Sequence, residues 1–239
     1  MLINSEKCAG CQSCVPYCPV SALETLENGT VTVNMDLCVE CGVCLRAEVC
    51  DSDAIYQQEL TWPRVLRSIF SNVKTLAPGT SLGGRGTEEM KTNDATNRFL
   101  PGFLGIGIEM GRPGVASRLS EAEKVTMAVA KMGIVFEKEN PVYDLFADPS
   151  TGKMKDEVLS ERVLSLVLEF VIPRQRLSEF ISIIREVAPR LDTVFSLDLI
   201  VVAENDGSVD PTIAEELIGL GFPPAPNGKT NLGLGRKSN

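Results

Sequence analysis

The sequence contains no histidine among its 239 residues. A chain without imidazole groups has no Ser-His-Asp or Cys-His catalytic arrangement, no histidine-ligated metal and no histidine proton switch. Long apolar runs are also missing, since none approaches the roughly 20 residues that a transmembrane helix needs. Cysteine is absent from residues 51–239. These absences exclude several classes of enzyme site and predict that the protein does not cross a membrane.

All eight cysteines lie within a stretch of 43 residues at the start of the chain, and they form two similar sets. The first set is Cys8, Cys11, Cys14 and Cys18, followed by Pro19, and the second is Cys38, Cys41, Cys44 and Cys50. The first set has the C-x2-C-x2-C-x3-C-P spacing that holds [4Fe–4S] cubes. Three thiolates two residues apart can reach three corners of one cube from a single tight loop. This spacing predicts two iron–sulfur clusters.

The duplication continues beyond the cysteines. Cys18-Pro19-Val20-Ser21-Ala22-Leu23 corresponds to Cys50-Asp51-Ser52-Asp53-Ala54-Ile55. Residues 1–58 thus resemble a bacterial-type ferredoxin with two [4Fe–4S] clusters. In such ferredoxins the fourth ligand of each cluster comes from the other motif. The resemblance implies that cluster 1 is held by Cys8, Cys11, Cys14 and Cys50, and cluster 2 by Cys38, Cys41, Cys44 and Cys18.

Two features depart from the ferredoxin pattern. The last gap of the second set is longer by two residues, over 45–49, and Asp51 replaces the expected proline. We expect this insertion to alter the loop beside cluster 1 without removing a ligand. We also expect Gly10 and Gly42, which lie inside the motifs, to let the backbone approach the sulfurs closely.

Two other uses of eight cysteines are possible. Structural zinc favours pairs of C-x2-C, whereas this chain has a triplet followed by a lone cysteine twice. A disulfide framework suits a small secreted chain, but Met1-Leu2-Ile3-Asn4 is followed by Glu6 and Lys7 instead of a signal peptide. Iron–sulfur chemistry is sensitive to oxygen, so we expect the cytoplasm of an anaerobic prokaryote.

Charge is distributed unevenly along the chain, whose net charge is −9. Residues 1–60 contain nine acidic and two basic residues, whereas residues 61–118 contain eight basic and four acidic ones. An acidic iron–sulfur unit is poorly suited to nucleic acid, which needs a basic surface. It is suited to a basic docking surface on a redox partner.

Residues 61–101 are expected to connect two domains, 1–60 and 102–206. The apolar spacing over 62–73 predicts a short helix that closes over the back of the iron–sulfur unit, with Trp62 or Arg64 as alternative partner contacts. Residues 77–101 read as a linker or basic arm. Its segment Gly83–Asp94 is expected to lie across an acidic surface of this protein or of a partner subunit. The alternative is that the backbone N–H groups of Gly83-Gly84-Arg85-Gly86-Thr87 cradle an anion.

The remainder predicts an α+β domain with the order β-α-β-β-α-β, the split βαβ arrangement. Strands are expected over 103–110, 134–136, 163–172 and 194–203, with helices over about 120–132 and 177–187. Ser120-Glu121-Ala122-Glu123 predicts a capping box, and 140–157 a loop with a turn at 148–152. Residues 207–239 are expected to add a helix capped by Asp210, and a tail.

The strand that precedes Met110-Gly111-Arg112-Pro113-Gly114-Val115-Ala116, with the helix after it, resembles an ACT domain. That resemblance implies an edge-to-edge sheet pairing, and hence a homodimer or a docking role, and in some members an amino-acid ligand at this turn. Here Gly111 stands where those domains usually have Asp.

The predicted function is electron transfer through two [4Fe–4S] clusters, as the iron–sulfur subunit of an anaerobic oxidoreductase. No set of residues suggests bond-making catalysis, so the catalytic subunit or a redox partner protein would be a separate polypeptide. The alternative is a redox- or metabolite-sensing regulator that uses the ACT-like domain. A third possibility is sulfur or electron delivery in biosynthesis.

Overall fold

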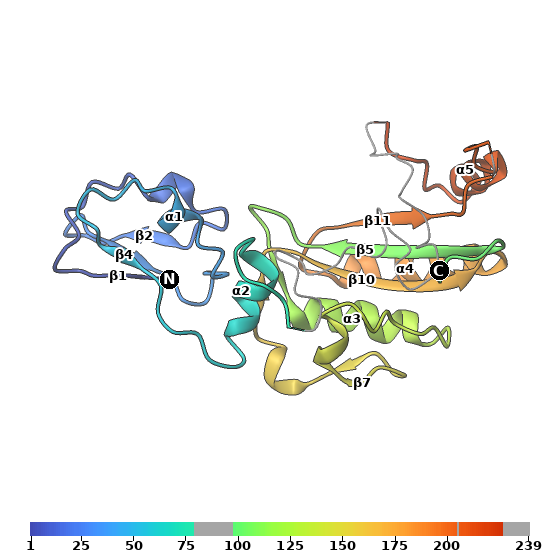
Figure 1. The fold of residues 1–239 in the computed structure, drawn as a ribbon, viewed down its shortest axis with the longest axis horizontal. Coiled ribbons are helices and arrows are strands. Elements are labelled where there is room, and N and C mark those ends of the chain that lie inside the picture. The colour runs from blue at the N-terminus through green and yellow to red at the C-terminus, as the bar shows by residue number, and fades with distance from the viewer. Residues whose placement is uncertain (79–97, 205, 227–239) are drawn as a thin grey trace.

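The computed structural model describes residues 1–78, 98–204 and 206–226, which form a mixed α+β structure with two apolar cores. The smaller core belongs mainly to the first 56 residues, and the larger one to the rest of the chain. Figure 1 shows the two parts at opposite ends of an elongated molecule, with helix α2 (Val65–Ser71) between them. The predicted arm Gly83–Asp94 lies outside the described residues.

The N-terminal part contains two short antiparallel strand pairs. Strand β1 (Leu2–Ile3) pairs with β4 (Ile55–Tyr56), and β2 (Leu23–Thr25) pairs with β3 (Val31–Val33). A 3-10 turn, η1 (Val15–Tyr17), follows the third cysteine of the first set. A short helix, α1 (Val43–Arg46), occupies the corresponding place in the second set. The strands therefore follow the sequence duplication, and the longer last gap is accommodated by a turn of α-helix.

The second part is built on a three-stranded antiparallel sheet with the order β10–β5–β11. Strand β5 (Phe103–Met110) lies in the centre, between β10 (Leu166–Pro173) and β11 (Phe195–Ile200). Helices α3 (Leu119–Ala130) and α4 (Leu177–Val187) pack against each other and share one core with the sheet. The apolar stripe predicted for the second helix is fully buried, at Leu177, Phe180, Ile181, Ile184 and Val187.

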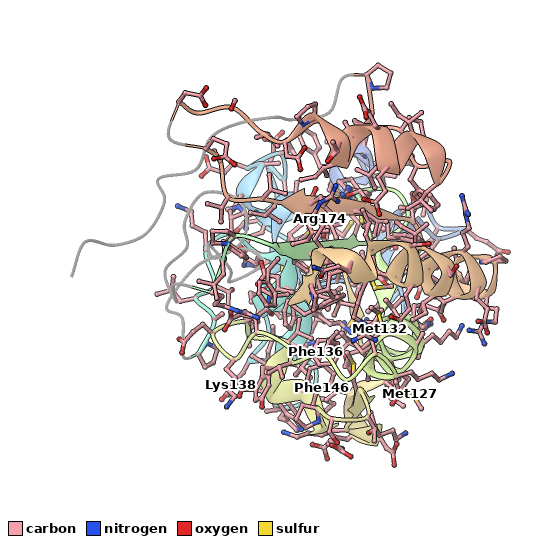
Figure 2. All side chains as sticks on the ribbon, turned by 90° about the vertical axis from the view of Figure 1, so that its right-hand side faces the viewer. Met127, Met132, Phe136, Lys138, Phe146 and Arg174 are labelled. Atoms are coloured by element: carbon pink, nitrogen blue, oxygen red, sulfur yellow. The ribbon has the colours of Figure 1, made fainter. Side chains whose placement is uncertain are left out.

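The predicted four-stranded ACT-like sheet is not formed. In place of a strand over 134–136 there is a single bridge between Phe136 and Phe170 of β10. Further along β10, the side chain of Asn140 donates to the Val167 carbonyl at 3.1 Å, so a side chain replaces strand pairing there. Figure 2 shows Phe136 next to Phe146, and their ring centroids lie 4.7 Å apart. The segment is therefore held by its aromatic side chain and not by a ladder.

Strand β5 is buried on both faces, whereas the alternation of its residues predicts a half-buried strand. The side chain of Phe99 covers Gly105 so closely that a Cβ at Gly105 would lie 2.5 Å from the Phe99 ring. Glu109, on the same face, is paired with Arg112 at 2.8 Å. A second layer thus lies over the face that the sequence suggests is exposed.

The capping box predicted at Ser120 is wrong. Helix α3 begins at Leu119, and its first N–H groups donate to backbone carbonyls, Leu119 to Glu161 and Ser120 to Leu159. These bonds continue the pairing of β6 (Ser117–Arg118) with β9 (Arg162–Val163). A neighbouring segment thus satisfies the donors that a side-chain cap would otherwise satisfy.

The region 140–157 is more ordered than a loop. It contains a hairpin of β7 (Phe146–Asp148) and β8 (Lys153–Met154), with the predicted turn between them. The other short elements are 3-10 turns: η2 (Tyr143–Leu145), η3 (Asp156–Val158), η4 (Arg174–Arg176) and η5 (Ala188–Arg190). Helix α5 (Pro211–Gly219) begins at the predicted cap, where Asp210 accepts from the Thr212 N–H at 2.9 Å. In the described ranges, no helix is long and apolar enough to cross a membrane.

Candidate metal centre

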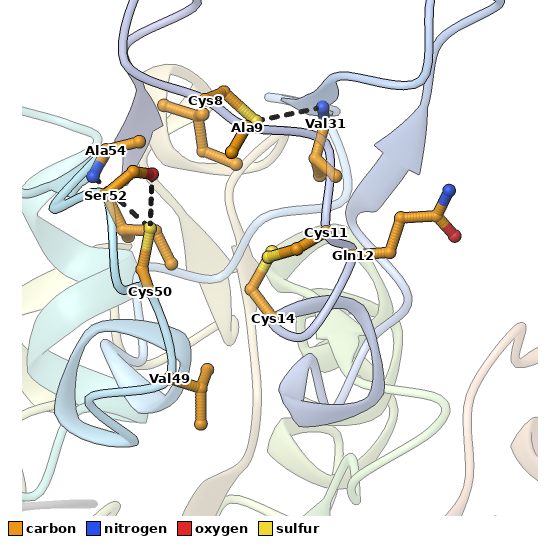
Figure 3. A pocket seen from close by; sticks show the side chains of 12 residues that line it. Cys8, Ala9, Cys11, Gln12, Cys14, Val31, Val49, Cys50, Ser52 and Ala54 are labelled. Atoms are coloured by element: carbon orange, nitrogen blue, oxygen red, sulfur yellow. Dashed lines mark hydrogen bonds between the residues drawn. The ribbon is translucent and has the colours of Figure 1, made fainter.

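Two cavities in the N-terminal part are each surrounded by four cysteines. The first is lined by Cys8, Cys11, Cys14 and Cys50 (Figure 3). The second is lined by Cys18, Cys38, Cys41 and Cys44. The rest of both linings is mainly apolar, with Ile3, Val31, Val49 and Ile55 at the first cavity. The fold therefore brings the eight cysteines together in the two groups that the resemblance implies.

The two cysteine loops share local backbone features. The Cys8 N–H donates to the Asn4 carbonyl at 3.0 Å, and the Cys38 N–H donates to the Asn34 carbonyl at 2.9 Å. Each asparagine side chain also accepts two backbone N–H groups from the residues that precede the cysteine. Sequence reasoning did not identify Asn4 and Asn34. Their common position, four residues before the first cysteine of each set, was the available signal.

Backbone N–H groups donate to cysteine sulfur at equivalent positions of the two motifs. The Ala22 N–H lies 3.1 Å from Cys18 Sγ, and the Ala54 N–H lies 3.3 Å from Cys50 Sγ. The Val31 N–H points at Cys8 Sγ from 3.5 Å. Hydrogen bonds to ligand sulfur spread its negative charge and are one means by which proteins tune an iron–sulfur cluster.

The glycines of the motifs lie at left-handed positions of the backbone. Gly10 and Glu40 occupy equivalent positions and both have positive φ, 69° and 54°. A Cβ at Gly10 would lie 2.8 Å from the Gly29 carbonyl oxygen, so the glycine is needed for contact with the β2–β3 turn. At the next equivalent pair, Gln12 and Gly42 have φ of 61° and 68°. The loop conformation is therefore left-handed at matching places even where the residue is not glycine.

Burial affects the thiols of the two cavities differently. At the second cavity, burial and the neighbouring thiols Cys41, Cys38 and Cys18 raise the pKa of Cys44 to about 12. Burial likewise raises the pKa of Cys38 and of Cys41. Three buried thiolates and a half-buried one, Cys18, need a positively charged group to compensate them, and metal coordination would supply that charge.

The first cavity is more open to solvent. Cys11 is exposed, and so are its neighbours Ala9 and Gln12, whereas every residue that lines the second cavity is buried or half-buried. Hydrogen bonds from Ser13 lower the pKa of Cys11, and bonds from Ser52 and the Ala54 N–H lower that of Cys50. Burial raises the pKa of Cys14, which lies on the inner side of this cavity.

The shape of both sites suits a cluster better than a single ion. Within residues 1–78, 98–204 and 206–226, no three Cys, Asp or Glu side chains converge closely enough to hold one metal ion. Instead, each cavity is surrounded by three thiols of one set and the last thiol of the other, which is the arrangement that a cube with a ligand at each corner requires. The disulfide alternative has no support either, because all eight cysteines are free thiols.

The second cavity also faces the rest of the molecule. The Gly114 N–H donates to the Pro19 carbonyl at 2.5 Å, and Ala116 packs in the same apolar core as the cysteines. The turn 111–116, where an ACT-like domain would bind a ligand, therefore contacts the cysteine-containing part instead.

Helix α2 forms the other contact between the two parts of the molecule, but its apolar face does not cover the iron–sulfur unit as predicted. Its apolar residues Leu66, Ile69 and Phe70 pack in the larger core, and Val73 is exposed beyond the helix end. Its arginines face the cysteine loops: Arg64 Nε donates to Glu40 at 2.8 Å, and Arg67 Nη1 donates to the Cys38 carbonyl at 2.8 Å.

Comparison with known proteins gives a family for the N-terminal part. Residues 1–51 match the family described as a 4Fe-4S dicluster domain. Pyruvate synthase subunit PorD of Methanocaldococcus jannaschii is 34% identical over 44 residues, which are 18% of this chain and 51% of that protein. The B subunit of the polysulfide reductase of Wolinella succinogenes is 40% identical over 60 residues, 24% of this chain and 30% of that protein. The protein thus spans about half of the first relative and less of the second, and no solved structure matches it.

The N-terminal part is therefore a dicluster domain of the ferredoxin type, whose cofactors are two [4Fe–4S] clusters. Such clusters accept and donate single electrons, so the domain implies electron transfer. The remaining residues have no family assignment.

Proposed function

We propose that this protein is the iron–sulfur subunit of an anaerobic, cytoplasmic oxidoreductase and relays electrons to or from a catalytic partner subunit. The observation that carries the proposal is the grouping of all eight cysteines around two cavities in a dicluster domain. The two relatives named above support it, since each is by name one subunit of a pyruvate synthase or a polysulfide reductase. The second domain is larger than electron transfer needs, which favours a dedicated partner.

The proposed ligands follow the cavities. Cluster 1 is held by Cys8, Cys11, Cys14 and Cys50, and cluster 2 by Cys18, Cys38, Cys41 and Cys44. The crossing of Cys18 and Cys50 between the motifs is supported by their places in the cavity linings.

Cluster 1 is the proposed side of electron exchange with the partner. The exposure of Cys11 supports this, because electron transfer requires close approach of the partner to a cluster. Glu48, Asp51 and Asp53, all exposed, lie in the sequence beside Cys50. They favour a partner whose docking surface is basic.

The regulatory alternative has weaker support. It needs an effector at the turn 111–116, and that turn is engaged with Pro19 through Gly114. It also relies on an ACT-like sheet, and the described residues form a three-stranded antiparallel sheet with one additional bridge instead. A homodimer through the second domain stays a prediction.

The test is an anaerobic purification with iron and sulfide counted per chain and co-purifying subunits identified. We expect about eight irons per chain and a larger partner that carries another cofactor. The variant C11S should retain about four irons, and so should C41S, because each removes a ligand of a different cluster. The variant S182A, an exposed position on α4, is the control that should keep eight. Zinc in place of iron would overturn the proposal.

A further inference from the structure

Arg67 is a buried arginine outside the dicluster domain that reaches into it. Only 5% of the residue is exposed, although it lies on α2, between the two parts of the molecule. Its Nη1 atom donates to the carbonyls of Met35 at 3.0 Å, Asp36 at 3.0 Å and Cys38 at 2.8 Å. These three carbonyls belong to the segment that presents the first ligand of cluster 2. The guanidinium therefore fixes that segment and places a positive charge beside it.

The other side of the guanidinium is engaged by one carboxylate. Arg67 Nε donates to Glu161 Oε2 at 2.5 Å, and Glu161 is itself 7% exposed. Glu161 comes from the second domain, directly before β9. The buried pair is thus oriented, with its cation against the Cys38 carbonyl and its anion on the side of the second domain.

The surroundings of the first cavity differ in this respect. The groups that contact its sulfurs are neutral, namely the Val31 and Ala54 N–H groups and the Ser52 hydroxyl. The described residues that line the first cavity include no arginine or lysine, and the exposed charges beside Cys50 in the sequence are acidic, at Glu48, Asp51 and Asp53. Two further cations on this side, Arg64 and the buried ammonium group of Met1, are both paired with the buried carboxylate of Glu40. Arg67 is therefore a cationic contact that distinguishes the two sites.

We propose that Arg67 is a positioning residue that raises the reduction potential of cluster 2 above that of cluster 1. Reduction adds one negative charge to a cluster, and a cation held in a medium of low dielectric constant stabilises the reduced form more than a cation in water does. Glu161 opposes this effect from a greater distance, since Arg67 lies between it and the Cys38 carbonyl. The one-electron-reduced protein then holds its electron mainly on cluster 2, beneath the second domain, and exchanges it through the exposed cluster 1. This inference rests on the ligand assignment proposed above.

The experiment is an anaerobic redox titration of the full-length protein, followed by electron paramagnetic resonance. The variants C11S and C41S assign the signals, because each leaves one cluster intact. In R67Q we expect the ratio of reduced cluster 2 to reduced cluster 1 to fall about tenfold, which for a one-electron couple corresponds to about 59 mV. In E161Q we expect the ratio to rise, because the opposing charge is lost. R67K keeps the charge and should lie between R67Q and the unaltered protein.

The matched control is R118Q. Arg118 also contacts the segment before Cys38, through Asp36 at 2.7 Å, but its side chain and that of Asp36 are 36% and 63% exposed. Solvent screens such a pair, so R118Q should leave both potentials unchanged. Opposite shifts in R67Q and E161Q are the signature of charge, since a merely structural role predicts loss of cluster 2 in both.

The outcomes separate this inference from the proposed function. An iron content near zero in the unaltered protein would refute the proposed function. Eight irons, with a potential of cluster 2 that R67Q and E161Q leave unshifted or shift in the same direction, would overturn only the role of Arg67. If R67Q binds only four irons, its potentials cannot be compared, and the test passes to R67K and E161Q. A ratio of reduced cluster 2 to reduced cluster 1 that is raised in E161Q supports the inference, and an unchanged ratio overturns it.

Discussion

The turn 111–116 joins the two parts of the molecule, and Gly111 is the residue at which we expect it to be most sensitive. Gly111 has φ of +77°, and an added Cβ would lie 2.6 Å from the Leu164 carbonyl oxygen and 3.2 Å from the Ala116 carbonyl carbon. A left-handed conformation costs an alanine about 1–2 kcal/mol. Because the obstructing atoms are backbone atoms, the turn itself must move, and overpacking of this kind costs about 1–3 kcal/mol more. We therefore expect G111A to lower the free energy of unfolding by roughly 2–5 kcal/mol.

Gly114, in the same turn, provides the matched control. Its φ is +90°, and a Cβ there would meet no atom within 4 Å. G114A should therefore show only the conformational cost of about 1–2 kcal/mol. The difference between the two variants, about 1–3 kcal/mol, corresponds to a Tm that is roughly 2–12 °C lower for G111A in a protein of this size.

The assay is thermal unfolding of the cluster-loaded protein under anaerobic conditions, with far-UV circular dichroism and visible cluster absorbance recorded at one scan rate. A fixed scan rate is needed because cluster loss makes unfolding irreversible. Since Ala116 packs in the core of the cysteines, the absorbance should be lost at the lowered temperature as well. Equal Tm values for G111A and G114A, or a less stable G114A, would refute the reasoning.

Other variants test the packing and the surface pairs. The Phe180 side chain has 0% exposure, and its ring packs edge-on against Phe170. F180A should therefore lower the free energy of unfolding, measured in urea, by about 3–5 kcal/mol. I218A, at an exposed position, should change it by no more than about 0.5 kcal/mol. N140A removes the donor to the Val167 carbonyl and to Glu169, and we expect a loss of about 1–3 kcal/mol by the same measurement. R118Q should cost at most about 1 kcal/mol at pH 7, because the pair with Asp36 is largely exposed. The hydrogen bond from Arg118 lowers the pKa of Asp36, so the pair contributes fully above the ordinary value of 3.8 and loses its contribution as the pH falls below it. The Tm difference between R118Q and the unaltered protein should therefore shrink from pH 7 to about pH 3, and a growing difference would contradict this sign.

Sequence patterns predicted a helix correctly where its own apolar spacing or capping residue was sufficient to define it. The stripe from Leu177 to Val187 and the cap at Asp210 are both present in the structure. The capping box at Ser120 failed because β9 and the residues before it supply the carbonyls that satisfy the first turn of α3. The strand over 134–136 failed because only Phe136 forms a bridge with β10, and further along β10 the Asn140 side chain, not a backbone group, donates to the Val167 carbonyl. In both cases a neighbour distant in sequence decided the local structure.

The contacts around the second cavity could not be predicted from sequence patterns either. The apolar spacing over 62–73 places Arg67 among the polar positions of the predicted helix, yet it is buried against Cys38 and Glu161. Its burial depends on α2 lying between two units, and no spacing rule encodes that position. The same holds for the turn 111–116, whose motif suggested a ligand and whose structural role is contact with Pro19.

The sequence by itself determined the cofactor of this protein, because ligand spacing within a loop is a local property that fixes which atoms can reach one cluster. It also determined the helices whose apolar stripes are continuous. Only the tertiary structure decided which cavity is covered by the second domain, which cysteine is exposed and where the buried charges lie. Those properties depend on the packing of segments up to 95 residues apart, such as Trp62 and Glu157, and therefore on the fold as a whole.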